Sequence, residues 1–594
     1  MILPALDALY TRLAADSTYG LPQPGYSTQK ISFCLVLQPD GTLFDIHDAR
    51  NTTGKRPVGS PMLVPGNAKS SGSGLNPCFL WDNSQYMLGY KADDKNPART
   101  EETFAAFRKK HLLLEAQIND PAYTAVCLFL KSWTPEQTVA HQAKLDDFAA
   151  TGFGVFQLQG EPGYVHERPA VRGWWEKHNL DDIDEKPVVA QCLVTGEIGP
   201  VARIHKPGIK VNADTPGGAL IVSFNDKAYE SYGKEQSYNA PVSAAVAFRY
   251  TNALNALLAG PQSSRHRVQI GDATCVFWTE RQTITESLFS ALLGFTAPDE
   301  LAETSQDEGL RSRLKIFLEV LRQGGGRKID QLGDDAQTRF YFLGLSPNAA
   351  RLSVRFWHVD SLGSLVDNLK SHYDALRLDR PPGHTPEFPT ARQLLGATAI
   401  VRHKGDRDET DFDTIPPLLS GPLLRAILTG GDYPRGLYQA VLQRIRADQT
   451  ISYFRAAVLK AFLNRNHNHA LPMSLEPART DPAYLLGRLF AVLEKAQTDA
   501  LPGLNATIKD RFYGAASANP APVFPRILRT AQHHLAKLEP SFRIPHEKRL
   551  QEIVGQLNGF PRQLSLEGQG LFAIGYYHQK QNFYVKKPAD ASAE

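Results

Sequence analysis

The chain has 594 residues, of which 42% are hydrophobic and 21% are charged. These proportions are those of a folded protein, so global disorder is excluded, and the length is that of several domains rather than one. The formal net charge is only +3, but residues 473–594 hold 15 Lys and Arg against 11 Asp and Glu. The positive surplus therefore lies in the C-terminal segment.

The N-terminal stretch MILPALDALYTRL does not fit a secretory signal, because Pro4 and Asp7 interrupt the apolar core that such a signal needs. A run of about 18 apolar residues, as a membrane span requires, is absent from the sequence. The five cysteines are odd in number and widely spaced, which argues against a disulfide framework and against a Cys-x-x-Cys metal site. We therefore expect a cytoplasmic protein that does not enter a membrane.

Residues 1–379 mix strand-like and helix-like patterns. The run KISFCLVLQPDGTLFDIHD, with its Pro-Asp-Gly turn, predicts a hairpin. GALIVSFND predicts a strand, and RFYFLGLSPNAARLSVRFWHVD predicts a hairpin turned at residues 346–348. Between them, APVSAAVAFRYTNALNALLAG predicts a buried helix that ends at Gly260. Without a clean βαβ repeat, the region is predicted to be mixed α/β, and the whole chain to be of the α+β class with an all-α C-terminal bundle.

An acid-free run extends from Ala49 to Trp81. It contains MLVPGNAKSSGSGLNPCFLW, whose glycines let the backbone approach another molecule closely, but it matches neither G-x-x-x-x-G-K-[ST] nor G-x-G-x-x-G. Its cations are Arg50, Lys55, Arg56 and Lys69. Cations without acids predict a surface that faces a polyanion. A flexible surface loop between two strands fits the local pattern equally well.

A second polar segment, residues 192–243, is rich in groups that address phosphate, sugar or base edges. Three tyrosines, Tyr229, Tyr232 and Tyr238, are interleaved with them, so base stacking is feasible. The alternative is a loop between strands whose amides and tyrosines satisfy buried backbone groups. The polar groups are Arg203, His205, Lys206, Lys210, Asn225, Lys234, Gln236 and Asn239.

The segment RPPGHTPEFP, residues 380–389, holds five Pro and Gly in ten positions and interrupts regular structure. We predict a linker over residues 380–415. PLLRAILTG, GLYQAVLQRIRADQ and YFRAAVLKAFLNRN then predict an arginine-rich helical layer over residues 416–472, whose cations are typical of the solvated faces of amphipathic helices. Residues 473–594 show apolar stripes that predict four helices in a small antiparallel bundle.

Catalytic motifs are missing: the sequence has no H-E-x-x-H, no Cys/His zinc spacing and no G-x-S-x-G. We therefore expect no metal and no cofactor. In the pair His533-His534, His534 follows the apolar stripe and is predicted to be a core histidine, whereas His533 beside Arg529 can face a phosphate. Scattered acids such as Glu197 and Asp226 leave a metal-dependent nuclease as an alternative.

Five blocks in this order resemble the large subunit of the type I-C CRISPR surveillance complex, Cascade: CLVTGEIGPVARIHK, VSFNDKAYESYGKEQSYNAPVS, FLGLSPNAARLSVRFW, PPLLSGPLLRAILTG and LNATIKDRFYGAASANPAPVFPRIL. The resemblance extends to LEGQGLFAIGYYHQ near the C-terminus. It implies a protein of antiviral defence that is not an enzyme. In such complexes the guide RNA reads the target by base pairing, while protein reads a short flanking duplex motif, the PAM, and stabilises the displaced strand.

The resemblance also implies partners. They are the guide CRISPR RNA, the double-stranded target DNA with its displaced strand, the backbone and 5′-handle-binding subunits, the small subunit, and a helicase-nuclease that is recruited once the R-loop has formed. A non-catalytic scaffold that only binds guide RNA is a further alternative.

Two loops are then candidates for duplex contact. The acid-free run is the first, with Asn side chains suited to minor-groove acceptors and cations suited to phosphates. Its candidate residues are Lys55, Arg56, Asn67, Lys69, Ser70, Ser71 and Asn76. The second is a further DNA loop or a wedge that splits the first base pairs, with Lys234, Gln236 and Asn239.

Met473 precedes the predicted bundle. Type I-C large-subunit genes that this sequence resembles produce a separate small subunit from an internal start in the same reading frame. The resemblance implies that Met473 is such a start. The alternative is that Met473 is an ordinary linker methionine. Copies of this segment would follow the displaced strand along a basic groove. The candidate groove residues are Lys509, Arg511, Arg526, Arg529 and His533.

Overall fold

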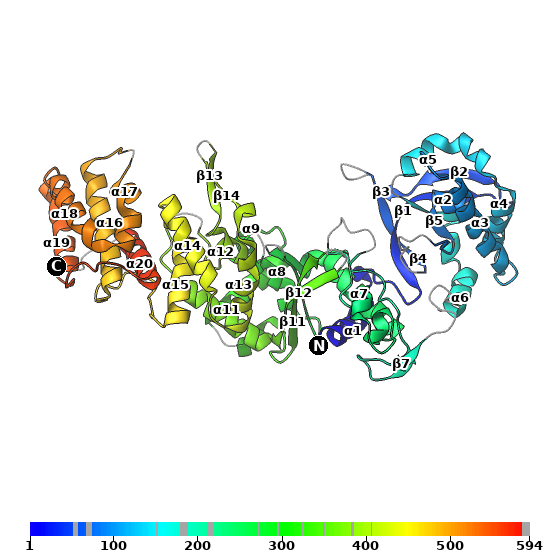
Figure 1. The fold of residues 1–594 in the computed structure, drawn as a ribbon, viewed down its shortest axis with the longest axis horizontal. Helices are drawn as coiled ribbons and strands as arrows, with labels where there is room; N and C mark the ends of the chain where they lie inside the picture. The colour runs from blue at the N-terminus through cyan, green and yellow to red at the C-terminus, as the bar shows by residue number, and fades with distance from the viewer. Residues whose placement is uncertain are drawn as a thin grey trace. The chain divides into compact units, whose positions relative to one another are not determined.

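The computed structural model describes residues 1–51, 57–66, 74–149, 152–178, 188–211, 218–270, 273–293, 296–323, 326–348, 351–381, 385–404, 407–504 and 506–584. The chain forms two compact units (Figure 1). Unit 1 comprises Met1–Ser263 and Pro347–Ser353, and unit 2 comprises Ser264–Ser346 and Val354–Glu594. This division differs from the segment boundaries that the sequence suggested. Both units combine helices with a sheet, and the C-terminal part is helical, which confirms the predicted α+β class.

The sheet of unit 1 is built around one long strand, β1. The first half of β1 pairs with β4 and its second half with β2, while β6 runs parallel to it on the other side. The predicted hairpin around the Pro-Asp-Gly turn is confirmed as β1 and β2. The six strands are β1 (Tyr26–Leu37), β2 (Leu43–Asp48), β3 (Arg50–Asn51), β4 (Val58–Pro65), β5 (Trp81–Asn83) and β6 (Phe153–Leu158).

Both faces of this sheet are covered, as the uninterrupted burial of the second half of β1 requires. Phe33 and Leu35 belong to the larger core, where the Phe79 ring stacks on Trp175 at 4.9 Å. Val36 faces a smaller core on the opposite side. The helices of this part are α2 (Ser84–Leu88), α3 (Pro97–Leu114), α4 (Pro121–Ser132), α5 (Gln142–Ala149) and α6 (Pro169–His178).

The rest of unit 1 is organised by helix α7 (Ala244–Ala259), which ends at Gly260 as predicted. Helix α1 (Ile2–Ala14) packs along it, and Arg249 forms an ion pair with Asp7 at 2.7 Å. Before α7 lie the hairpin β7 (Val189–Gln191) and β8 (Ile198–Pro200) and two 3-10 helices, η5 (Lys227–Tyr229) and η6 (Gln236–Asn239).

The strand predicted from GALIVSFND is wrong. Ala219 and Leu220 form only isolated bridges, to Ile209 and to Arg351, and the chain then continues without regular structure. An apolar run signals burial, but a strand also needs a continuous partner strand, and the segment meets two different neighbours instead.

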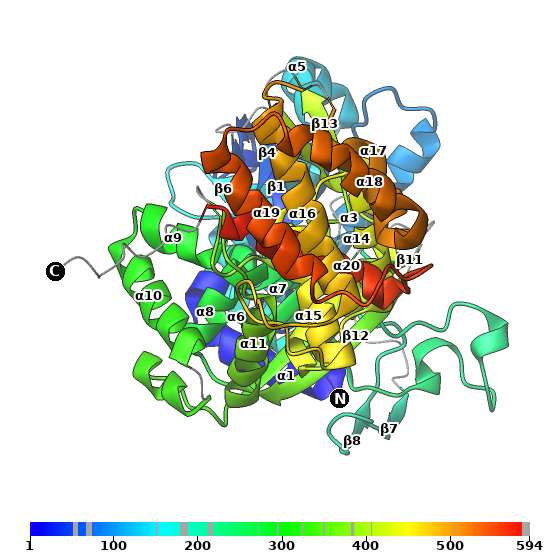
Figure 2. The same cartoon turned by 90° about the vertical axis from the view of Figure 1, so that its left-hand side faces the viewer.

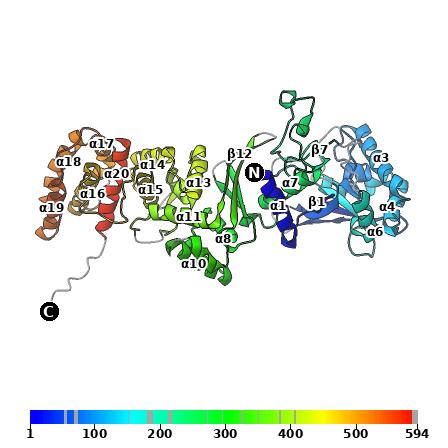
Figure 3. The ribbon, with the colours of Figure 1, turned by 90° about the horizontal axis from the view of Figure 1, so that it is seen from below.

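The sheet of unit 2 has four antiparallel strands in the order β12-β11-β10-β9. They are β9 (Arg267–Ile270), β10 (Ala273–Thr279), β11 (Arg339–Asn348) and β12 (Arg351–Ser361). Helices α8 (Ile284–Leu293), α10 (Glu308–Gln323) and α11 (Leu362–Leu376) supply the core of this part, with Phe289 edge-on to Phe277 of β10 at 4.9 Å. Figure 3 shows α8, α10 and α11 beside β12. A short helix, α9 (Pro298–Thr304), packs on α10.

The predicted hairpin β11–β12 is confirmed, but the turn predicted at residues 346–348 is wrong. These residues still belong to β11, and the connection follows at positions outside the described residues. Among the described residues, the pairing of β11 with β10 extends to Leu345, two positions before Pro347.

The predicted linker, residues 380–415, contains regular structure. Helix α12 (Ala391–Gly396) is followed by the hairpin β13 (Ile400–Lys404) and β14 (Arg407–Asp411). The helical layer after it is present as predicted, with α13 (Ser420–Thr429), α14 (Arg435–Asp448) and α15 (Tyr453–His467). The Pro- and Gly-rich run 380–389 breaks helices on both sides, but it does not prevent a short helix from starting directly after it, at the Thr390 cap.

Two cations of this layer are buried, contrary to the expectation of solvated faces. Arg455 donates to the carbonyl oxygens of Ala397 at 3.2 Å and Thr450 at 2.8 Å, and it pairs with Asp448. Lys460 donates to the Ala375 carbonyl at 3.2 Å, and burial lowers its pKa to about 8. These side chains connect α15 to its neighbours and are not available to a ligand.

The C-terminal bundle has five helices rather than the four predicted: α16 (Pro482–Ala500), α17 (Ile508–Ala518), α18 (Pro520–Leu535), α19 (Pro540–Val554) and α20 (Leu566–Asn582). Helix α17 was missed because it is short and carries few apolar residues. Helix α16 packs against the four others, and it crosses α20 most closely (Figure 2). A methyl group added at Gly487 would stand 2.0 Å from the Phe572 carbonyl oxygen, so the two backbones touch there.

Within the described residues, no helix combines the length and the apolar character needed to cross a membrane.

Candidate nucleic-acid interface

The structure describes one of the seven candidate residues of the acid-free run. Lys55, Arg56, Asn67, Lys69, Ser70 and Ser71 lie outside the described residues. Asn76 is described and exposed, and its backbone N–H donates to the Tyr86 hydroxyl at 3.2 Å. This hydrogen bond holds the backbone at Asn76.

The N-terminal end of this loop is attached to the sheet of unit 1. The Trp81 indole on β5 donates to the Pro65 carbonyl at 2.6 Å, and Trp81 itself is fully buried. The next residue, Gly66, donates its N–H to the Gly25 carbonyl at 2.7 Å. The Trp81 indole thus ties the end of β4 to β5, although β1 and β6 lie between these two strands in the sheet.

The C-terminal end is held by two cations from α3. The Arg99 guanidinium donates to the Gly74 carbonyl at 2.9 Å, and the Lys110 ammonium donates to the Pro77 carbonyl at 2.9 Å. Sequence reasoning missed both residues. Their separation of 11 positions is three helical turns, which places them on one face of α3, and this spacing was the available signal.

Arg50, the one cation of the run among the described residues, is paired with an acid. Its guanidinium forms two hydrogen bonds with the Asp48 carboxylate, at 3.0 and 2.8 Å, and its side chain is only 8% exposed. Asp48 lies just before the acid-free run, so a count that starts at Ala49 overlooks it.

In the second loop, Asn239 holds the backbone. Its side-chain amide donates to the carbonyl oxygens of Lys234 at 2.7 Å and Gln236 at 2.9 Å, and its Oδ1 accepts the Ser231 N–H at 2.9 Å. Gln236 turns its Oε1 into a buried position. Of the three candidates in this loop, the structure presents Lys234 as an exposed side chain.

The tip of this loop presents a tyrosine that the candidate residues did not include. Ser231 and Lys234 are joined by a backbone hydrogen bond of 3.0 Å, and Tyr232 and Gly233 between them have φ of 55° and 68°. Two successive positive φ angles are typical of a tight type I′ turn. Tyr232 is 99% exposed, so the turn holds its ring in solvent beside Lys234. The signal in the sequence was Tyr-Gly followed by a lysine.

Arg351 braces the base of the same loop from the hairpin tip that belongs to unit 1. Its guanidinium donates to the Asn225 side chain and lies 4.6 Å from the centre of the Tyr229 ring. Tyr229 and Asn225 therefore have structural contacts, while Tyr232 extends beyond them.

His205 is a core histidine and not a phosphate ligand. It is completely buried, and its Nδ1 lies 2.8 Å from the Tyr250 hydroxyl on α7. Burial lowers its pKa to about 4, so the ring is neutral at neutral pH.

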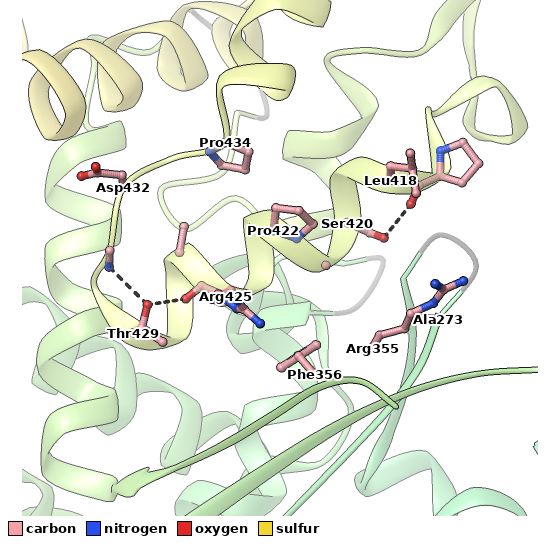
Figure 4. A pocket seen from close by; sticks show the side chains of 14 residues that line it. Ala273, Arg355, Phe356, Leu418, Ser420, Pro422, Arg425, Thr429, Asp432 and Pro434 are labelled. Atoms are coloured by element: carbon pink, nitrogen blue, oxygen red, sulfur yellow. Dashed lines mark hydrogen bonds between the residues drawn. The ribbon is translucent and has the colours of Figure 1, made fainter. Parts of the chain in front are cut away.

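In unit 2, a hollow of about 470 Å³ lies between α13 and the sheet (Figure 4). Its lining includes Arg355 and Phe356 of β12 and Arg425 of α13. Leu418 at the entrance is 80% exposed. The lining therefore combines two guanidinium groups, the Asp432 carboxylate and apolar side chains.

The displaced-strand candidates lie on α17 and α18. Arg526, Arg529 and His533 are three, then four, positions apart and share one exposed face of α18. The Arg526 guanidinium lies 5.5 Å from the ring of Phe512, the neighbour of the exposed Arg511 on α17. Within residues 506–584, no ion pair neutralises these three arginines.

Of the two adjacent histidines of α18, His534 is the core histidine that the sequence predicted. His534 is buried, and its pKa is lowered by burial and by the charges of Lys537 and His533. His533 is exposed on the arginine face.

The two acids considered for a nuclease site lie in different local settings. Asp226 accepts the Ala228 N–H at 2.9 Å and caps η5, while Glu197 stands exposed at the turn of the β7–β8 hairpin. Among the described residues, no group of three or more His, Cys, Asp and Glu side chains is arranged to hold a metal ion.

Comparison with known protein families identifies the family of this chain. The model of the CRISPR-associated protein family Cas_Csd1 matches residues 6–584, which is nearly the whole chain. The chain belongs to this family. It is thus a large subunit of the type I-C Cascade complex, as the sequence blocks indicated. No curated protein matches the sequence significantly.

In this Cascade large subunit, Met473 lies in the stretch between α15 and α16. Its side chain is 44% exposed, and its carbonyl accepts the Asp379 N–H at 3.1 Å. The Ser474 hydroxyl donates to the Asp379 carboxylate at 2.9 Å. All five helices of the C-terminal bundle follow Met473 in the chain.

Proposed function

We propose that this Cascade large subunit recognises the PAM on double-stranded DNA, helps to start and stabilise the R-loop, and recruits the helicase-nuclease. It does so in the cytoplasm as part of antiviral defence, bound to guide RNA and to the other Cascade subunits. In this proposal it has no catalytic role, and cleavage belongs to the recruited partner.

The observation that carries the PAM assignment is the attachment of the acid-free loop. Both ends of the loop are fixed to the folded part of unit 1, through Trp81 at one end and Arg99 and Lys110 at the other. A loop with fixed ends and no acid within it can approach a duplex without charge repulsion. Lys69 and Asn76 are its proposed groove contacts, while Lys55 and Arg56 would hold phosphates.

The second loop supports a role in strand opening, but with different residues from those that the sequence suggested. Because the amide of Asn239 is engaged within the loop and Gln236 is turned inward, Tyr232 and Lys234 are better placed to meet DNA. An exposed aromatic ring at a rigid tip can stack on the last base pair as the next one opens, and the lysine can hold the adjacent phosphate. We therefore assign the wedge role to Tyr232, with Lys234 beside it.

The face of α18 supports a role in holding the displaced strand. Arg526, Arg529 and His533 point to one side of the helix and have no acidic partners within residues 506–584. A row of unneutralised cations attracts a phosphate backbone without reading its sequence.

The alternatives predict different behaviour. A metal-dependent nuclease would need an acid cluster, and the acids Glu197 and Asp226 give no sign of one among the described residues. A guide-RNA scaffold would bind RNA but would not distinguish DNA with a PAM from DNA without one.

Substitution of Lys69 tests the PAM contact. In assembled complex, Lys69→Ala should weaken binding to PAM-containing duplex more than binding to PAM-less duplex. Lys177→Ala, an exposed lysine on α6, is the matched control and should change neither. If Lys69→Ala weakens both duplexes equally and lowers the salt slope by about one unit, the lysine touches only phosphate and its groove role is rejected.

A further inference from the structure

A second hollow in unit 2 lies where the segment before α15 meets the end of α20 and the start of α17. It has a volume of about 370 Å³, which is at the small end of ligand pockets and suits a single nucleotide unit rather than a longer segment. The helical layer supplies one wall, including Thr450, Ser452 and Phe454, and the C-terminal bundle supplies the other, including Lys509, Lys580 and Gln581.

The charge of this hollow is positive. Among the described residues that line it, there is no Asp or Glu, while two lysines are present. The Lys580 ammonium donates to the Tyr576 hydroxyl at 3.2 Å and lies 4.0 Å from the Glu494 carboxylate, so it is partly neutralised. The Lys509 side chain makes no hydrogen bond or ion pair with any described residue, so its charge is available to an anion.

The apolar part of the hollow is aromatic and rigid. Tyr577 is fixed by a hydrogen bond from its hydroxyl to the Asp379 carbonyl, at 2.7 Å, and Tyr576 by a hydrogen bond to Glu494. Phe454 is partly exposed and meets Tyr453 edge-on at 5.6 Å. Proteins bind single-stranded nucleic acid with this combination of aromatic rings and lysines, because bases stack on the rings and phosphates pair with the cations.

The hollow lies close to Arg526 of the basic face described above. Lys509 is in the first turn of α17, and Phe512, three positions further on, lies under Arg526 of α18. Because residues three positions apart share a face of a helix, a strand held by Arg526 can continue to Lys509 and to the hollow.

We propose that this hollow takes one unpaired base of the displaced strand, with Phe454 against the base and Lys509 on the adjoining phosphate. The proposal rests on the proposed strand-holding role of the bundle and adds a base-binding position to it. The bundle alone supplies half of the position, because Phe454 comes from the helical layer.

Base removal provides the test. The full-length protein is titrated with a fluorescent oligothymidylate and with an abasic oligomer of the same length. The wild type should prefer the oligothymidylate by about fivefold or more, the effect of one stacked base. Phe454→Ala should abolish this preference and leave abasic binding unchanged. The control Phe542→Ala, an exposed phenylalanine on α19, should behave as the wild type.

Lys509→Ala should weaken both oligomers without changing their ratio. Because Phe454 also packs against the core, a measurement on the wild type accompanies the variant: a photo-cross-linked iododeoxyuridine oligomer should attach to the peptide that contains Phe454.

The outcomes separate the two proposals. Equal binding of both oligomers overturns the base position but leaves a phosphate-only track in place. A preference that persists in Phe454→Ala, with cross-links elsewhere, also overturns it. If neither oligomer binds, the strand-holding role falls as well.

Discussion

Gly570 on α20 lies directly against the hydroxyl of Tyr438 on α14. A methyl group at position 570 would stand 2.0 Å from that oxygen, which itself donates a hydrogen bond to the Leu566 carbonyl at 2.8 Å. The C-terminal bundle is thus joined to the helical layer at a point where only glycine fits. The two walls of the small hollow come from these same two parts, so the contact also sets the distance between them.

Gly570→Ala should lower the free energy of unfolding by about 2–4 kcal/mol, since overpacking costs about 1–3 kcal/mol and the tyrosine hydrogen bond about 1 kcal/mol. Gly514→Ala is the control: no atom lies within 4 Å of the added methyl group, and alanine should raise the stability of α17 by up to about 1 kcal/mol. Denaturant unfolding measures both. Equal stability of the two variants would show that α14 and α20 do not approach as closely as described.

Tyr232→Ala should impair binding to linear PAM-containing duplex, while a target with a pre-melted bubble should restore it, because the ring is needed only for strand opening. Tyr232→Phe keeps the aromatic face and should retain most of the binding. Since Gln236 and Asn239 serve the loop itself, Asn239→Ala should act indirectly by loosening the turn. If the bubble fails to rescue Tyr232→Ala, the wedge role is rejected.

Stability should fall as the pH is lowered. Burial lowers the pKa of His111, His372 and His578 to about 3, whereas an unfolded histidine titrates near 6.5. Between these values the unfolded chain binds more protons, so the free energy of unfolding decreases with falling pH, by up to about 1.4 kcal/mol per pH unit for each histidine.

The contribution of one histidine can be isolated by comparing two variants. His372→Phe should reduce the slope of stability against pH between pH 4 and 6. Tyr433→Phe removes the hydrogen bond that His372 makes but keeps the imidazole, so it should preserve the slope. Identical slopes in both variants would contradict a neutral buried His372.

Met473→Leu, encoded by a non-start codon, should remove a small protein of residues 473–594 if Met473 is an internal start. Binding of the complex to long targets should weaken, because free copies of the bundle would no longer follow the displaced strand. Intact-mass analysis detects the small species directly. Its persistence in the variant, or its absence from the wild type, would reject the internal start.

The sequence predicts elements well where local pattern and packing agree. The hairpin β1–β2 has strong turn chemistry, and α7 has both a helical apolar pattern and a terminal glycine. GALIVSFND failed because a strand depends on a partner that is distant in sequence. Helix α17 was missed because four buried residues leave only a weak stripe.

The sequence indicated which kinds of residues the candidate site contains, but it did not show which contacts their side chains make. Arg455 and Lys460 look like surface cations in the sequence, and only tertiary packing shows that they are buried between helices. In the sequence, Asn239 could equally contact a base or stabilise the loop. Its three hydrogen bonds within the loop show that it stabilises the loop. Tyr232 became prominent because two positive φ angles expose it, a feature that composition does not reveal.

In the function proposed above, this Cascade large subunit recognises the PAM and does not cut DNA. The direct measurement incubates purified complex, without the helicase-nuclease, with magnesium and a plasmid that carries the target next to a functional PAM or next to a scrambled one. Tight binding to the first plasmid alone, with both plasmids left intact, is the predicted result. Cleavage of either plasmid would contradict the non-catalytic role, and equal binding to both would contradict PAM recognition.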